Sequence, residues 1–266
     1  MPHVVDCEIK AHQEVAPGHY RMALHCPGIA KEALPGQFCM IEVRPGYHPF
    51  LRRPMSIERI FRDGVSILYK VEGEGTRLLS GYRTGQSLNV QGPLGKPFPL
   101  PGEGKRPILV GGGIGVAPLP GLAERLMREA GRTPDIVLAA RTDSLLLCGK
   151  DFAQMRCRVV LATDDGSARM KGFASDALRT LNPGPDTVVY CCGPMPMMRA
   201  VHDVCAELDA PCFASLEALM ACGDGVCMGC VVEANVEIEA ERMVRVCADG
   251  PVFDSRVINW SAAGKR

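Results

Sequence analysis

Four cysteines toward the C-terminal end of the chain have the spacing of metal ligands. Cys222, Cys227 and Cys230 form the pattern C-x4-C-x2-C, and Cys247 follows further along. Plant-type 2Fe-2S centres are ligated by four thiolates with this spacing. Their loop needs little side-chain bulk, because backbone N–H groups must approach the sulfides, and glycine is supplied at Gly223, Gly225 and Gly229. The sequence therefore predicts a one-electron 2Fe-2S cluster ligated by Cys222, Cys227, Cys230 and Cys247.

Two other interpretations of these cysteines stay open at this point. One is a zinc site, although zinc ribbons usually pair two short C-x2-C units and Cys247 has no near partner cysteine. The other is four ordinary buried thiols. The two interpretations share one consequence, a colourless protein, whereas a 2Fe-2S cluster absorbs visible light.

Composition limits the class of protein. With 266 residues, of which 47% are hydrophobic, the chain has room for two or three domains. Lys+Arg and Asp+Glu both number 30, so nothing indicates a nucleic-acid or membrane-surface partner. We expect no membrane span and no export signal. The 13 cysteines then predict a cytoplasmic protein with free thiols rather than a disulfide framework.

Residues 1–101 are expected to form an antiparallel β-barrel, because short strands alternate with Pro-Gly turns. The predicted strands cover residues 4–9, 20–24, 38–43 and 65–71. The R-x-P-x-S segment at 52–56 lies on another strand, where the guanidinium of Arg53 can fork onto a phosphate. Gly75 and Thr76 lie at a predicted helix start, whose N–H groups also suit a phosphate. Taken alone, the first feature could be a charged edge strand and the second a plain helix cap. The phosphate interpretation is favoured because both occur together, followed by the G-P-L-G stretch at 92–95.

Residues 102–211 alternate strands and helices, which predicts a parallel sheet with right-handed crossovers. Strands are expected at 108–110, 136–140, 159–162 and 187–191, with helices at 118–130, 175–181 and 195–208. The glycine-rich run from Gly111 follows a strand and precedes a helix, as in dinucleotide-binding loops. That fingerprint ends in Gly or Ala, whereas this chain has Pro118, which suits a first helical turn. Cys192 ends the last strand, at the edge where such sheets bind ligands.

The order of these motifs resembles the ferredoxin reductase superfamily. R-x-P-x-S, Gly-Thr, G-P-L-G, G-G-G-I-G-x-A-P and C-G-P follow one another as they do there, and the cysteine loop comes last. The whole chain is similar to the electron-transfer subunits of B-type, NAD-linked dihydroorotate dehydrogenases. The resemblance implies an FAD-binding barrel (1–101), an NAD-binding α/β domain (102–211) and a small 2Fe-2S domain (212–266).

The resemblance also implies roles for individual residues. Arg53 would contact the FAD pyrophosphate and Ser56 the isoalloxazine edge. The full set implied to hold FAD is Arg53, Pro54, Met55, Ser56, Tyr69, Lys70, Val71, Gly75 and Thr76. The set implied to receive NAD is Gly112, Gly113, Ile114, Gly115 and Pro118, with Cys192 near the nicotinamide as the catalytic residue.

The implied activity is electron transfer within a larger enzyme. A partner subunit with FMN would oxidise dihydroorotate in pyrimidine biosynthesis, and electrons would pass through the 2Fe-2S cluster and FAD to NAD⁺. The partner is expected in a heterotetramer with two copies of each subunit. A related subunit that serves ferredoxin or sulfide with NAD(P)H, and a zinc-stabilised regulatory module, are the alternatives. The choice between NAD and NADP stays open. After the second strand, Asp143 would suit the ribose hydroxyl of NAD and Arg141 the 2′-phosphate of NADP.

Overall fold

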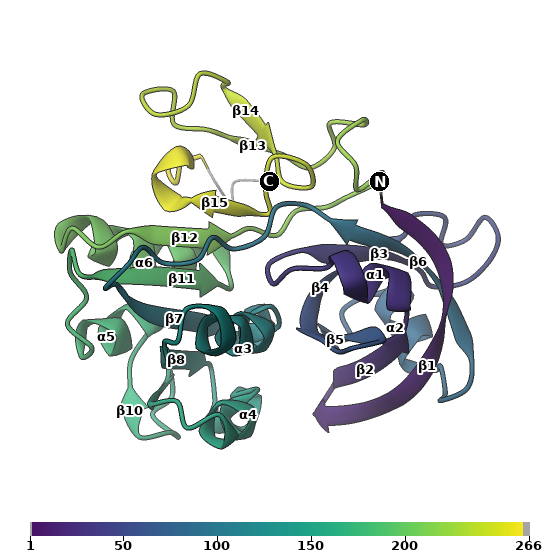
Figure 1. Ribbon diagram of the computed structural model, residues 1–266, viewed down its shortest axis with the longest axis horizontal. Helices are drawn as coiled ribbons and strands as arrows, with labels where there is room; N and C mark the ends of the chain where they lie inside the picture. Colours follow the sequence, from purple (N-terminus) through teal and green to yellow (C-terminus); the bar gives the residue numbers. More distant parts are fainter. Residues whose placement is uncertain (1, 263–266) are drawn as a thin grey trace.

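The N-terminal unit is a closed antiparallel barrel. The computed structural model describes residues 2–262, and Figure 1 shows the barrel beside a layered α/β unit. Its strands follow the order β1-β2-β5-β4-β3-β6. Helix α1 (Pro27–Glu32) and helix α2 (Glu74–Ser80) accompany the strands. The strand bounds are β1 His3–Ala16, β2 His19–His25, β3 Phe38–Glu42, β4 Arg53–Ile60, β5 Gly64–Lys70 and β6 Ser87–Leu94.

The barrel closes around apolar side chains that alternate with outward ones along each strand. On β4, Met55 and Ile57 are buried in the barrel core together with Ile41 of β3 and Ile67 of β5. Their neighbours Pro54 and Ser56 are only partly buried. The R-x-P-x-S segment therefore presents Pro54 and Ser56 on the outer wall.

The second unit is a seven-stranded sheet with the order β10-β9-β8-β7-β11-β12-β15. All neighbouring pairs are parallel except β12 with β15, which is antiparallel. The strand bounds are β7 Arg106–Gly112, β8 Asp135–Ala140, β9 Val159–Thr163, β10 Met170–Lys171, β11 Thr187–Cys192, β12 Cys212–Ser215 and β15 Val252–Asp254. The parallel α/β architecture expected from the sequence is confirmed.

Helices cover both faces of this sheet. Helix α3 (Leu119–Glu129) and helix α4 (Gly149–Gln154) bury Leu122, Leu126 and Phe152 in one core. Helix α5 (Ala174–Arg179) and helix α6 (Met195–Glu207) bury side chains such as Leu178 and Val201 in another. Short 3₁₀ helices are η1 (Gly113–Val116), η2 (Asp143–Leu145) and η3 (Ser255–Val257).

The C-terminal segment folds over both other units (Figure 1). It contains a two-stranded sheet of β13 (Val231–Glu233) and β14 (Met243–Arg245). Its β12 and β15 extend the sheet of the second unit, while the boundaries 101/102 and 211/212 stay predictions. Cys230 and Cys247 share one apolar core with Met40 and Leu94 of the barrel. The cysteine loop is therefore fixed against the barrel by common packing.

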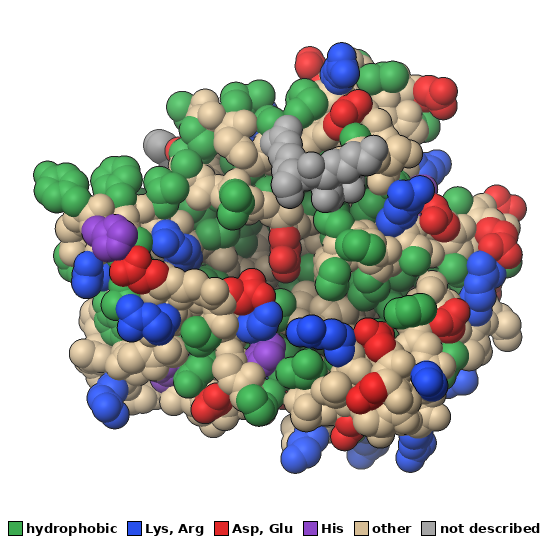
Figure 2. Space-filling view, turned by 180° about the vertical axis from the view of Figure 1, so that it is seen from behind, with side chains coloured by type: hydrophobic (Ala, Val, Ile, Leu, Met, Phe, Trp, Pro, Cys, Tyr) green, Lys and Arg blue, Asp and Glu red, His purple; other side chains and the backbone are tan. Residues whose placement is uncertain are grey.

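The molecular surface has no strong charge bias on the side seen in Figure 2, where acidic and basic side chains are interspersed. Within residues 2–262, no helix is both long and apolar enough to cross a membrane.

Candidate functional site

The cysteine loop brings its four thiols together as two pairs. The backbone N–H of Cys227 donates to Cys222 Sγ, and that of Cys247 donates to Cys230 Sγ, both at 3.4 Å. Among the described residues, no three ligating side chains gather as they would around one ion. A 2Fe-2S cluster has two irons and four cysteine ligands in all. Two thiol pairs fit that group better than a four-cysteine zinc site, where all four sulfurs surround one metal.

Backbone donors tune the exposed end of this loop. The N–H of Gly229 donates to Cys227 Sγ at 3.4 Å. Hydrogen bonds from backbone N–H groups, first that of Cys222 and then that of Gly229, lower the pKa of the Cys227 thiol to about 7. The thiolate is the form that ligates metal, so the loop favours the ligand state at Cys227.

The side chain of Arg245 holds the cysteine loop in place through hydrogen bonds. Its guanidinium donates to the carbonyl of Gly225 at 3.2 Å and to Asp249 Oδ1 at 2.9 Å. Gly225 has φ +91°, and an added Cβ would lie 2.8 Å from that of Ala248. Only glycine fits this backbone comfortably, which explains one of the loop glycines noted in the sequence.

Arg53 and helix α2 form one cradle on the barrel. The side chain of Arg53 lies against the first turn of α2 so closely that a Cβ at Gly75 would stand 2.9 Å from Arg53 Cζ. Thr76 accepts hydrogen bonds from the backbone N–H groups of Glu72 at 3.0 Å and Gly73 at 3.2 Å. A guanidinium beside glycine backbone suits a phosphate. The structure thus joins two motifs that lie far apart in sequence, and this cradle fits the pyrophosphate of FAD.

Tyr69, another residue implied to flank the flavin, is engaged elsewhere. Its side chain is 2% exposed, and it stacks on Tyr20 at a ring distance of 5.7 Å. His12 Nδ1 lies 2.9 Å from the carbonyl of Tyr82 and must donate to it, so Nε2 accepts from the hydroxyl of Tyr69 at 2.9 Å. This leaves the backbone of Tyr69, with Lys70 and Val71, to border a flavin.

The glycine-rich loop meets the C-G-P segment at the carboxyl edge of the sheet. Cys192 of β11 pairs in register with Gly111 of β7. A Cβ at Gly115 would lie 2.6 Å from the backbone nitrogen of Gly193 and 2.7 Å from the carbonyl carbon of Cys192. Gly113 has φ +54° and open space above it. The residues expected to receive NAD, Gly112, Gly113, Ile114 and Gly115, span the end of β7 and helix η1, and Pro118 directly precedes α3.

Cys192 lies at this junction with its thiol enclosed. The residue is 2% exposed and lies opposite Ser215 of β12. Burial raises the pKa of the Cys192 thiol, and the charge of Glu217 raises it further. The thiol is therefore neutral, and its catalytic role stays a prediction.

Sequence reasoning missed Glu217. This carboxylate lies just after β12, and its charge raises the pKa of Cys192. Glu72, which follows the Tyr69–Val71 segment, raises the pKa of Glu217 in turn. Desolvation by the surrounding protein raises its pKa, with Glu72 adding to the effect. A single acidic residue in a loop carries no pattern that could have identified it. The charge of Glu217 therefore affects a residue predicted to lie near the nicotinamide, Cys192, and is affected by one next to the predicted flavin segment, Glu72.

The G-P-L-G stretch packs against the C-terminal segment. The backbone N–H of Lys96 donates to the carbonyl of Gly250 at 2.6 Å. Gly95 has φ +78°, and a Cβ there would lie 2.9 Å from that same carbonyl. The stretch therefore connects the barrel to the segment that follows Cys247.

Two family models match the chain. One is described as the iron-sulfur cluster binding domain of dihydroorotate dehydrogenase B and matches residues 217–259. The other is described as the oxidoreductase NAD-binding domain and matches residues 109–203. They cover the cysteine loop and the glycine-rich loop described above.

Full-length relatives and solved structures agree with these matches. The dihydroorotate dehydrogenase B (NAD(+)) electron transfer subunit of Desulforamulus reducens is 38% identical over 98% of this chain and 100% of its own. That of Lysinibacillus sphaericus is 36% identical over 92% and 94%. The structure of an NADH-dependent reduced ferredoxin-NADP oxidoreductase is 30% identical, with a TM-score of 0.83 over 96% of this chain and 90% of that one. Phthalate dioxygenase reductase, at 22% identity and a TM-score of 0.61 over 76% of this chain and 64% of that one, shares the fold.

Fold and site together define a ferredoxin reductase-like electron-transfer protein with a cysteine-ligated cluster unit. Within that class, the chain belongs to the family of dihydroorotate dehydrogenase B (NAD(+)) electron transfer subunits.

Proposed function

We propose that this protein passes electrons from an FMN-containing dihydroorotate dehydrogenase catalytic subunit to NAD⁺. The observation that carries the proposal is the contact between the cysteine loop and the flavin barrel. A Cβ at Gly223 would lie 2.6 Å from Met40 Cγ, and Met40 pairs in register with Pro54 of the R-x-P-x-S segment. The predicted cluster and flavin sites are thus separated by little more than one side chain.

Each cofactor supplies chemistry that the protein cannot. FAD exchanges hydride with nicotinamide and single electrons with an iron–sulfur cluster, so it belongs between the two. The chain's own residues would bind and orient: Arg53 and the Gly75 cradle would hold phosphate, and Ser56, on the outer wall, would border the isoalloxazine. Gly113 would give the dinucleotide access to backbone, while Gly115 lets the loop pack against Gly193. Cys192 would contribute a neutral, packed thiol beside the nicotinamide.

The partner subunit is proposed to cover the cysteine loop. Cys227 is exposed, and apolar side chains next to the ligands are strongly exposed: Leu219 at 92%, Val226 at 80% and Met228 at 51%. Burial of such side chains drives association. We expect the electrons to enter the protein through this face.

The cytoplasm is the proposed location. All 13 cysteines lie in the described part of the chain, and none of them forms a disulfide there. Free thiols in such number belong to a reducing compartment.

Replacement of Cys227 by Ser tests the proposed order of cofactors. Co-expressed with the catalytic subunit, the variant should lose the visible absorption of the cluster and dihydroorotate-dependent NAD⁺ reduction. It should keep NADH reduction of bound FAD. Cys157→Ser, which changes a thiol remote from the loop, is the control. Equal loss of NADH oxidation in Cys227→Ser would refute the order, and a colourless wild-type protein would refute the redox function.

A further inference from the structure

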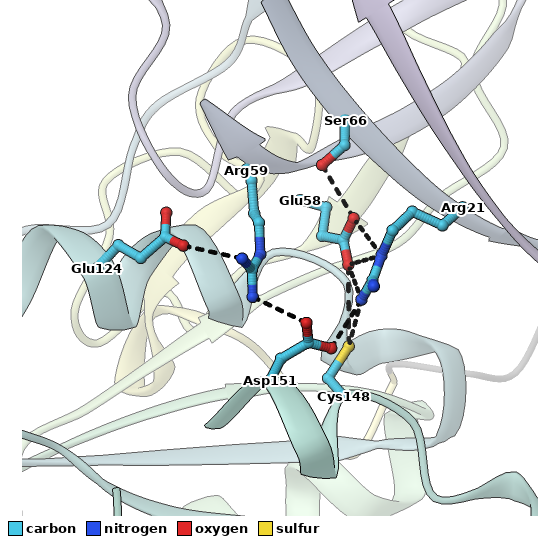
Figure 3. A network of polar contacts seen from close by, with 7 residues as sticks. All are labelled: Arg21, Glu58, Arg59, Ser66, Glu124, Cys148 and Asp151. Carbon is cyan, nitrogen blue, oxygen red and sulfur yellow. Dashed lines mark hydrogen bonds and ion pairs between the residues drawn. The ribbon is translucent and has the colours of Figure 1, made fainter. Parts of the chain in front are cut away.

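Strand β4 carries an irregularity just beyond Ser56. Its register with β5 shifts between Ile57 and Arg59. Ile57 lies in the barrel core and Ile60 packs against it, so the extra residue leaves both Glu58 and Arg59 on the outer wall. Bulges of this kind redirect side chains. Two consecutive charged residues of the flavin strand therefore face the nicotinamide-binding unit, as Figure 3 shows.

Glu58 is fully buried and satisfied from the barrel side. It is 0% exposed. Its carboxylate accepts from Arg21 Nε at 2.8 and 3.0 Å and from Ser66 Oγ at 2.9 Å. A buried charge needs such full pairing, so Glu58 fixes the position of the Arg21 guanidinium.

Asp151 of α4 pairs with two arginines of the barrel, Arg21 and Arg59. Arg21 Nη2 lies 2.8 Å from Asp151 Oδ2, and Arg59 Nη2 lies 3.0 Å from Asp151 Oδ1. Arg59 also reaches Glu124 of α3 at 3.2 Å. The network thus ties the flavin strand to two helices of the other unit (Figure 3). Both arginine contacts to α4 depend on Asp151, whereas the contact to α3 runs through Glu124.

Helix α3 also touches β4 directly. A Cβ at Gly121 would lie 2.7 Å from the carbonyl oxygen of Glu58. Since α3 begins right after the glycine-rich loop, its position on β4 sets where that loop stands relative to Ser56. A cavity of about 240 Å³ between Arg21 and Arg59 borders the network and includes none of the predicted cofactor residues.

We propose that Asp151, with Arg21, Arg59 and Glu124, is a positioning device that sets the distance between nicotinamide and flavin for hydride transfer. The proposal rests on the proposed function. Hydride transfer moves two electrons with one proton from NADH to FAD, so NADH is oxidised and the flavin reduced. The reacting atoms must approach to about 3–3.5 Å, and a misplacement of about 1 Å can cost about 100-fold in rate. Domains joined by a modest interface otherwise move relative to one another.

The test compares Asp151→Asn with Asp135→Asn in the purified protein with its cofactors. Asp135 is a matched control, because it too is 18% exposed and pairs with an arginine, Arg106, at 2.7 Å, but within one unit. Stopped-flow reduction of FAD by NADH should be about 10–100-fold slower in Asp151→Asn, with little change in the Kd for NADH. The long-wavelength charge-transfer absorbance of stacked nicotinamide and reduced flavin should weaken. Asp135→Asn should match the wild type.

Two further measurements separate positioning from general damage. FAD and iron content should stay at the wild-type level, and hydrogen–deuterium exchange should rise at residues 53–60 and 149–154 in Asp151→Asn only. Asp151→Glu, which keeps the charge, should recover much of the rate. If Asp151→Asn does not fold, Glu124→Gln at the edge of the network should show the same slowing to a smaller degree.

Equal rates in Asp151→Asn and Asp135→Asn would overturn the proposal, as would a normal rate in Glu124→Gln when Asp151→Asn does not fold. Loss of FAD from Asp151→Asn in step with the lost rate would also overturn it, because the effect would then be structural. Failure of the wild type itself to reduce FAD with NADH would instead count against the proposed function.

Discussion

Met40 of the barrel and Gly223 of the cysteine loop are in direct contact, with Met40 Cγ 2.6 Å from where a Cβ at Gly223 would stand. Gly223 also has φ +79°, a backbone conformation that favours glycine. Because Met40 pairs with Pro54, the contact joins the predicted cluster loop to the predicted flavin strand. A shift of the cysteine loop toward the barrel is therefore blocked by the Met40 side chain.

The first prediction follows from this contact. Gly223→Ala should lower the iron content of the purified protein while FAD content stays normal, because the loop must move away from Met40. Gly18→Ala is the control, since Gly18 has φ +69° but no neighbour within 4 Å. It should cost only backbone strain, about 1 kcal/mol. Adding Met40→Ala to Gly223→Ala should restore part of the iron; no restoration would contradict the role of the contact.

A second prediction concerns the Arg53 cradle. Gly75→Ala should reduce FAD affinity with little loss of thermal stability, because the added methyl would displace the guanidinium end of the Arg53 side chain rather than backbone. FAD retention on gel filtration and the melting temperature are the measurements. Gly73→Ala, where nothing lies within 4 Å, should retain FAD. A Gly75→Ala variant that binds FAD as tightly as the wild type would argue against phosphate binding at this cradle.

The third prediction concerns the two loops at the sheet edge. Gly115→Ala should destabilise the protein by about 1–3 kcal/mol, as overpacking does, because its Cβ would meet the backbone of Gly193 and Cys192. It should also abolish FAD reduction by NADH while cluster and FAD content stay normal. Gly131→Ala, with φ +60° and open space, is the control for general destabilisation. Normal NADH oxidation in Gly115→Ala would exclude this loop as the nicotinamide site.

Glu217 provides a prediction on pH dependence. The side chain of Glu217 is exposed to solvent on one side, but desolvation by the protein around it, with the charge of Glu72, raises its folded-state pKa. The folded protein therefore binds more protons than the unfolded chain between the two pKa values, and stability falls as pH rises through that window. Glu217→Gln should melt at a higher temperature than the wild type near neutral pH, and the advantage should vanish below the unfolded pKa.

Glu207→Gln is the counterpart, because Arg179 lowers the pKa of Glu207. This variant should gain no stability near neutral pH. Thermal melts of both variants over a pH series give the comparison. A Glu217→Gln variant that melts below the wild type at neutral pH would contradict the predicted destabilising effect of the Glu217 charge.

The sequence by itself determined those features whose chemistry is local. The spacing of Cys222, Cys227 and Cys230 is encoded within one short loop, and so are the glycines that such a loop requires. The glycine-rich run from Gly111 is equally local, and the alternation of strands and helices predicts the parallel sheet. These patterns can be recognised without any knowledge of packing. Their order along the chain then indicated the family.

Tertiary structure alone decided which charged and polar residues meet. Glu58 and Asp151 look in sequence like ordinary solvated acids, and their pairing with Arg21 depends on a bulge in β4 and on how α4 packs against the barrel. Strands β12 and β15 span four and three residues, too few to show a period. Burial and charge pairing depend on partners far apart along the chain, so only the folded molecule could bring the charge of Glu217 to bear on Cys192 or place Asp151 between two domains.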